Sequence, residues 1–109
     1  MKSEMNKPTR ESQIEKYLVA QVKALGGECR KVRWIARTNA PDRFVMLPPR
    51  YLCARPTAHP QSIWVELKAP GKKPTSGQLR EHERMRGMGQ RVEVIDSFEG
   101  VDKLIGEMR

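Results

Sequence analysis

A glutamate and a lysine two residues apart lie within the most apolar segment of the chain, Ser62–Lys68. The segment has the pattern of a β-strand, in which side chains alternate between two faces. Glu66 and Lys68 then share a face with Trp64, and the opposite face is aliphatic: Ile63, Val65 and Leu67. A carboxylate and an ammonium group are costly to bury without a purpose. The same triplet is also typical of a plain ion pair at a strand end, so by itself it is weak evidence for catalysis.

A second carboxylate, Asp42, follows Pro41 and directly precedes the short apolar segment Arg43–Leu47. If the two strands are neighbours, Asp42 and Glu66 can meet, and a hard divalent cation such as Mg²⁺ would relieve their repulsion. Lys68 could then orient the attacking water and stabilise the transition state of phosphodiester hydrolysis. Without a metal site, Asp42 is a turn residue after proline and Lys68 an ordinary surface lysine.

The first predicted helix offers two further carboxylates, Glu11 and Glu15. Both are spaced three and seven residues before members of the apolar stripe formed by Ile14, Leu18 and Val22. This spacing extends the buried face of the helix toward the sheet. Either glutamate could complete an acidic cluster, although the helix macrodipole alone favours a carboxylate near a helix N-terminus.

Hydrophobic periodicity predicts the elements that must hold these residues. Glycines and prolines mark most of their ends. The expected helices cover about 10–25, 75–88 and 98–108, and the expected strands 28–35, 43–47, 62–68 and 91–95. The order α-β-β-β-α-β-α predicts an α/β protein with a mixed sheet flanked by helices. We expect a flexible arm over residues 1–10, a single domain over 11–109, and an irregular, proline-rich loop over 48–60.

Composition favours a polyanionic partner. Twenty-one Lys and Arg against thirteen Asp and Glu give a net charge of +8, which favours nucleic acid but would also serve solubility. No apolar run approaches the roughly 18 residues of a membrane span, and the N-terminus lacks a signal-peptide pattern. Cys29 and Cys53 have no metal-ligand spacing and suggest a cytoplasmic protein, although a disulfide between them stays open. His59 and His82 lack the spacing of an H-N-H nuclease.

Several motifs together resemble a known family. Pro41-Asp42 followed by Glu66-Leu67-Lys68 resembles the PD-(D/E)XK nuclease signature, and the details resemble its VRR-NUC branch. The matching motifs are E-S-x-I-E-x-x-L at 11–18, L-G-G at 25–27, A-P-D-R at 40–43, V-E-L-K-A-P-G at 65–71, Gln78 with His82, and V-I-D-S at 94–97. The resemblance runs from about residue 11 to 105, and the ordered set is far more specific than its pieces.

The resemblance implies a restriction-endonuclease-like core and phosphodiester hydrolysis with Mg²⁺ or Mn²⁺. It implies that Asp42, Glu66 and the backbone carbonyl of Leu67 are metal ligands and that Lys68 is the catalytic lysine. It also implies an accessory acid from the first helix, Glu11 or Glu15, and a supporting role for Gln78. The family's Gly-Val before Pro-Asp is Asn39-Ala40 here, which could alter the turn.

Stand-alone members of this size resemble Holliday-junction resolvases, which implies a homodimer acting on four-way DNA junctions in a bacterial or phage-infected cell. Two alternatives stay open: another nuclease of the superfamily (flap, restriction or repair type), and a non-catalytic DNA-binding module. The expected phosphate contacts are basic residues near the site: Arg43, Lys72, Lys73 and Arg80. The 48–60 loop is longer than the family needs, and it could contact DNA or a dimer partner through Arg50, Tyr51 and Arg55.

Overall fold

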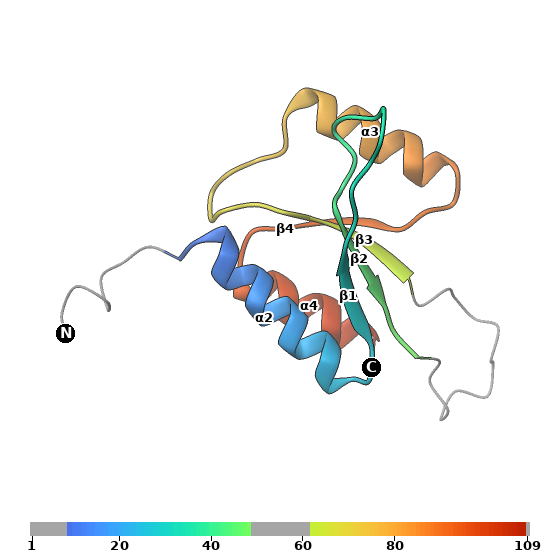
Figure 1. Cartoon of the computed structure of the whole chain (residues 1–109). Coiled ribbons are helices and arrows are strands. Elements are labelled where there is room, and N and C mark those ends of the chain that lie inside the picture. The colour runs from blue at the N-terminus through green and yellow to red at the C-terminus, as the bar shows by residue number, and fades with distance from the viewer. Residues whose placement is uncertain (1–8, 49–61, 109) are drawn as a thin grey trace.

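The computed structural model describes residues 9–48 and 62–108 and contains three helices and four strands in these ranges (Figure 1). The elements in chain order are α2 (Glu11–Ala24), β1 (Glu28–Lys31), β2 (Arg43–Met46), β3 (Ser62–Leu67), α3 (Ser76–Gly87), β4 (Val92–Ile95) and α4 (Phe98–Met108). This order confirms the predicted α/β class. None of the helices in the described ranges is both long and apolar enough to cross a membrane.

The four strands form one mixed sheet in the order β1-β2-β3-β4. The β1–β2 and β2–β3 pairs are antiparallel, whereas β3 and β4 are parallel and α3 makes the crossover between them. In the β2–β3 pair, Arg43 lies opposite Val65 and Val45 opposite Ile63. This register fixes which side chains of the two central strands lie beside each other.

The helices form layers on both faces of the sheet. In Figure 1, α2 and α4 pack side by side below the sheet, and α3 lies above it. The main core lies between the sheet and the α2–α4 layer, and Ile14, Val45, Ile63, Val65 and Val101 are completely buried in it. The predicted aliphatic face of β3 is thus the core face. Glu66 points to the other face, toward α3, where it contacts His82.

The first strand is shorter than its sequence pattern predicts. We expected it to reach Ile35, but β1 ends at Lys31, followed only by a bond from the Val32 amide to the Asp42 carbonyl at 2.9 Å. Beyond this bond Ala36 and Asn39 have positive φ angles of 61° and 69°, which a β-ladder does not accommodate. Residues 32–42 instead form a long connection that reaches toward α3 (Figure 1).

Parts of two predictions lie outside the described residues. They are the N-terminal arm, of which residues 1–8 are not described, and most of the 48–60 loop, which includes Arg50, Tyr51 and Arg55. Cys53 also lies in that loop, and Cys29 makes no disulfide within the described part of the chain.

Asn39 stands before Pro41-Asp42 at the position where the family resemblance implies glycine. Its φ of 69° lies in the left-handed region, which Asn tolerates better than other residues with a Cβ. We expect Asn39→Val to lower the free energy of unfolding by about 1–2 kcal/mol, and Asn39→Gly to change it little. Urea unfolding would measure both, with Thr38→Val as the control. Equal stability of Asn39→Val and Thr38→Val would contradict the explanation.

Candidate active site

Asp42 and Glu66 lie on neighbouring strands. Arg43 pairs with Val65 across β2 and β3, so continuing the antiparallel register by one residue places Asp42 opposite Glu66. Residues directly opposite each other in such a pair project to the same face of the sheet. The register thus places the two residues at adjacent positions on neighbouring strands.

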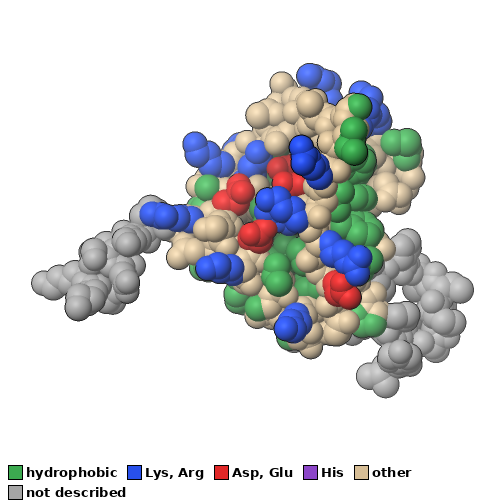
Figure 2. Space-filling model, in the orientation of Figure 1, with side chains coloured by type: hydrophobic (Ala, Val, Ile, Leu, Met, Phe, Trp, Pro, Cys, Tyr) green, Lys and Arg blue, Asp and Glu red, His purple; other side chains and the backbone are tan. Residues whose placement is uncertain are grey.

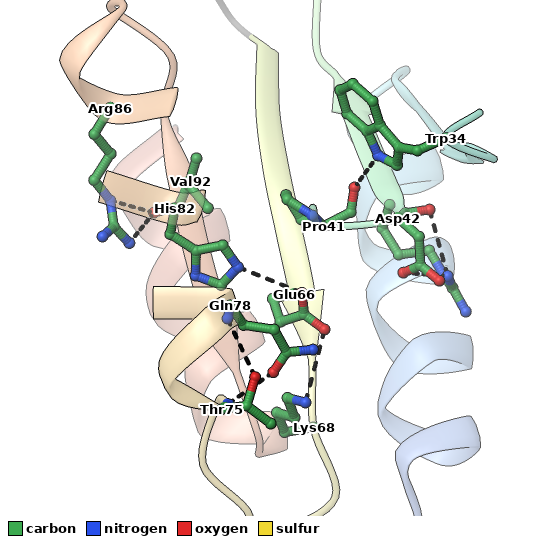
Figure 3. Close-up of polar contacts among 11 residues, drawn as sticks. Trp34, Pro41, Asp42, Glu66, Lys68, Thr75, Gln78, His82, Arg86 and Val92 are labelled. Carbon is green, nitrogen blue, oxygen red and sulfur yellow. Dashed lines mark hydrogen bonds and ion pairs between the residues drawn. The ribbon is translucent and has the colours of Figure 1, made fainter. Parts of the chain in front are cut away.

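Glu66 is nearly buried, with 8% of its surface exposed. Its carboxylate lies 3.9 Å from Lys68 Nζ and 3.4 Å from His82 Nε2 (Figure 3). The pKa of Glu66 is raised from 4.5 to about 7: burial raises it most, the charge of Lys68 lowers it, and smaller effects come from Asp42 and Glu11, which raise it, and from Arg43, which lowers it. Burial of the carboxylate, rather than the neighbouring charges, is therefore the main cause of the raised pKa of Glu66.

His82 of α3 contacts Glu66 and is completely buried. Its Nδ1 atom has no hydrogen-bond partner in the described residues. We therefore assign the proton to Nε2, which lets the ring donate to Glu66. Burial lowers the pKa of His82, and the charges of Arg86 and Lys68 lower it further. The sequence indicated His82 only as part of a family motif. Its position four residues after Gln78 is the pattern that places both side chains on the same face of a helix.

Arg43 joins β2 to the first helix. Its guanidinium pairs with Glu15 of α2, and its Nη1 lies 2.7 Å from Asp42 Oδ1. The Arg43 side chain is only 9% exposed, whereas that of Asp42 is 47% exposed. Arg43 thus holds the backbone and carboxylate of Asp42 in place, although we expected it from the sequence among the phosphate contacts.

The two glutamates of the first helix have different surroundings. Glu15 is engaged by Arg43. The charge of Glu11 acts on Glu66 and raises its pKa. Glu11 is the first residue of α2. Glu11 therefore influences Glu66 through its charge, whereas Glu15 forms an ion pair with Arg43.

Gln78 caps the N-terminus of α3. Its Oε1 accepts a hydrogen bond from the Thr75 amide at 2.9 Å, and the Gln78 amide donates to Thr75 Oγ1 at 3.1 Å. This reciprocal capping box fixes the start of the helix. In Figure 3 the Gln78 side chain lies between Thr75 and the Glu66–Lys68 pair, so the same residue that caps the helix also borders the site.

Basic side chains surround this region. Lys72, Lys73 and Arg80 are exposed, and none of them makes an ion pair within residues 9–48 and 62–108. Figure 2 shows acidic side chains grouped on one face of the molecule with Lys and Arg side chains between and around them. Such a face can attract a phosphate backbone while keeping a small acidic centre.

The donor set suits a magnesium-like ion. No three His, Cys, Asp or Glu side chains gather as a ready metal cage in the described part of the chain. Mg²⁺ does not require one, because it is usually held by one or two carboxylates, waters and substrate phosphates. Asp42, Glu66 and the Leu67 carbonyl provide that kind of set. The raised pKa of Glu66 fits it too, since a bound cation would favour the charged form of the carboxylate, which burial disfavours.

Two known proteins are similar to this chain over most of its length. No family model matches the chain. A protein of Acyrthosiphon pisum secondary endosymbiont phage 1 named "Putative nuclease p44" is 44% identical over 88 residues, which are 81% of this chain and 84% of that protein. A solved structure described as "VRR_NUC domain" is 39% identical, with a TM-score of 0.75, and the match covers 93% of this chain and 99% of that one.

The fold and these two similarities define a protein of the PD-(D/E)XK nuclease class. Within that class, the chain belongs to the VRR-NUC family.

Proposed function

We propose that this protein is a metal-dependent DNA endonuclease that cuts branched DNA, with the four-way junction as its expected substrate. The observation that carries the proposal is the placement of Asp42 opposite Glu66, with Lys68 Nζ 3.9 Å from the Glu66 carboxylate. A pure binding module would need only the basic surface, and nothing in binding alone requires a nearly buried glutamate beside a lysine.

Each residue has a distinct part in this chemistry. Asp42, Glu66 and the Leu67 carbonyl would hold Mg²⁺ or Mn²⁺, which when bound would polarise the scissile phosphate and lower the pKa of a water. Lys68 would orient the attacking water and stabilise the negative charge that develops on the phosphate oxygens. Glu11 would serve as the accessory acid, since its charge acts on Glu66. Gln78 and His82 would position the groups around them.

Junction resolution adds a requirement for symmetry. Two cuts on opposed strands need two active sites, which a C2 homodimer supplies. We therefore propose a homodimer. Sedimentation at assay concentration would test it: a strict monomer would exclude paired cutting and leave a flap or repair nuclease as the alternative.

The decisive experiment compares end-labelled four-way junction, fork, flap and plain duplex in Mg²⁺, Mn²⁺ or EDTA. It uses the wild-type protein and a double variant, Asp42→Ala with Glu66→Ala. Glu28→Ala is the matched control, because Glu28 is an exposed carboxylate in an ion pair with Arg30 on β1. Symmetric, metal-dependent nicks in the junction that only the double variant loses would support the proposal.

The other outcomes separate the alternatives. Cutting of flaps or duplex in preference to junctions would keep the nuclease and reject the resolvase. Tight binding without cutting in either metal would favour the non-catalytic DNA-binding module.

Two exposed lysines after β3, Lys72 and Lys73, are expected to contact phosphates without reading sequence. Changing both to alanine should weaken binding to all DNA sequences alike and reduce the slope of log affinity against log salt concentration by roughly 2. A salt titration monitored by fluorescence anisotropy would measure this. Lys23→Ala with Lys103→Ala, on the α2–α4 side, is the matched control. An unchanged slope in the Lys72/Lys73 variant would contradict the assignment.

A further inference from the structure

The connection between β1 and β2 exposes an apolar side chain in basic surroundings. Ile35 is 89% exposed, more than any other large hydrophobic side chain in the described residues. Four basic residues and no acidic one occur between Cys29 and Pro41: Arg30, Lys31, Arg33 and Arg37. Ile35 therefore contributes almost nothing to the core, and the basic residues beside it would suit a polyanionic partner that also offers an apolar contact.

This connection is held in one conformation. Trp34 Nε1 donates to the Pro41 carbonyl at 2.8 Å and closes the base of the loop. Arg37 Nε pairs with Glu81 Oε2 at 2.9 Å and ties the loop to α3. Directly after Ile35, Ala36 has a φ of 61°, a left-handed conformation that is unfavourable for a residue with a Cβ. Strain of this kind persists where surrounding contacts enforce it, and it is concentrated at functional segments.

The loop also borders the candidate active site. Its end carries Asp42, and its Asn39 side chain lies so close to Gly77 of α3 that a Cβ there would be 2.8 Å from Asn39 Nδ2. Gly77 directly precedes Gln78, and Glu81 directly precedes His82. Figure 1 shows the loop rising from the sheet to α3. A DNA strand with its phosphate at Asp42 and Glu66 would therefore pass beside this loop.

We propose that Ile35 is a wedge that enters the base stack at the branch point of the DNA substrate. The inference rests on the proposed DNA-cleaving function and identifies what in that substrate is recognised. Lys31 and Arg33, both exposed, would contact the flanking phosphates, and Ile35, two residues after Arg33, would face the bases. Apolar side chains insert between base steps in this way, and insertion costs least where bases are already unstacked, as at a branch.

The first test compares DNA affinities in EDTA, which prevents cutting. Ile35→Ser should bind a four-way junction about tenfold more weakly than the wild type, while its affinity for plain duplex stays the same. Ile35→Leu should retain junction binding. Met88→Ser is the matched control, because Met88 is a 67% exposed residue at the opposite end of α3. Since Ile35 has almost no buried surface to lose, folding of the variants should not limit the comparison.

The second test places 2-aminopurine either at the branch or in the middle of an arm. Wild-type protein should increase the fluorescence at the branch only, and Ile35→Ser should not increase it. Three results would overturn the inference. Ile35→Ser could lose as much affinity for duplex as for junction, the wild type could bind junction and duplex equally well, or Ile35→Ser could still increase the fluorescence at the branch. If the wild type cuts no DNA, the proposed function fails. The affinity and fluorescence measurements still test whether Ile35 inserts at the branch, because neither requires cutting.

Discussion

Glu66→Gln is expected to reduce the rate of DNA cleavage by roughly a thousandfold or more, with little effect on DNA affinity. Glutamine has the shape of glutamate and can still contact His82, which lies 3.4 Å from the carboxylate. It lacks the negative charge that a divalent ion requires from this position. The loss should therefore fall on the chemical step, and single-turnover cleavage of a saturating junction substrate would measure it.

Two further variants test whether the loss of cleavage is specific to this site. Glu28→Gln removes an exposed carboxylate from β1 and should cut at the wild-type rate. Lys68→Met keeps the length of the side chain and removes its charge, and should cost about a hundredfold to a thousandfold. If Glu66→Gln cleaved DNA at the wild-type rate, the reaction would take place at a different site. That result would contradict the assignment of Asp42, Glu66 and Lys68.

The stability of the metal-free protein should decrease as pH rises, which is unusual for a buried carboxylate with a lysine nearby. The pKa of Glu66 is about 7 in the folded protein against 4.5 for the free side chain. Between these values the folded state binds more protons than the unfolded state, so the free energy of unfolding falls with increasing pH. The stabilising contribution of Glu66 is fully present below pH 4.5 and is lost as pH rises through about 7.

We expect this effect to reach about 2 kcal/mol between pH 5 and 8 after allowance for solvent screening, which is a large part of a small domain's stability. Urea unfolding in EDTA at several pH values would measure it. His82 acts in the opposite direction, since its lowered pKa makes the folded state lose stability as pH falls. Comparison with Glu66→Gln, which retains His82, isolates the glutamate.

In that comparison, Glu66→Gln should be more stable than the wild type at pH 8 and nearly equal to it at pH 5. Adding Mg²⁺ at pH 8 should stabilise the wild type and leave Glu66→Gln unchanged, because binding to the folded state shifts unfolding by mass action. Parallel pH profiles for the two proteins would contradict the raised pKa of Glu66.

Local patterns in the sequence were sufficient for the elements and the central residues. The period-two alternation in Ser62–Lys68 predicted that Ile63 and Val65 face the core, where both are completely buried, and that Glu66 faces away. The helix period predicted the buried stripe of Ile14, Leu18 and Val22. These predictions held because alternation and helical spacing are properties of a few consecutive residues.

Other features depend on residues far apart in the chain. Both Glu11 and Glu15 had suitable spacing, and only the position of Arg43, 28 residues from Glu15, distinguishes the ion-paired glutamate from the one whose charge reaches Glu66. The end of β1 at Lys31 likewise depends on the left-handed residues that carry the chain to α3.

The sequence by itself thus determined the order of elements and the core faces, because each is encoded by short-range spacing, and its motifs predicted the Asp42, Glu66 and Lys68 set. Only the tertiary structure decided that His82 contacts Glu66, that Arg43 pairs with Glu15 and Asp42, and that Ile35 is exposed beside the site. These contacts follow from the strand register and from the packing of α3 and α2 on opposite faces of the sheet. Long-range packing of this kind selects among side chains that local patterns leave equivalent.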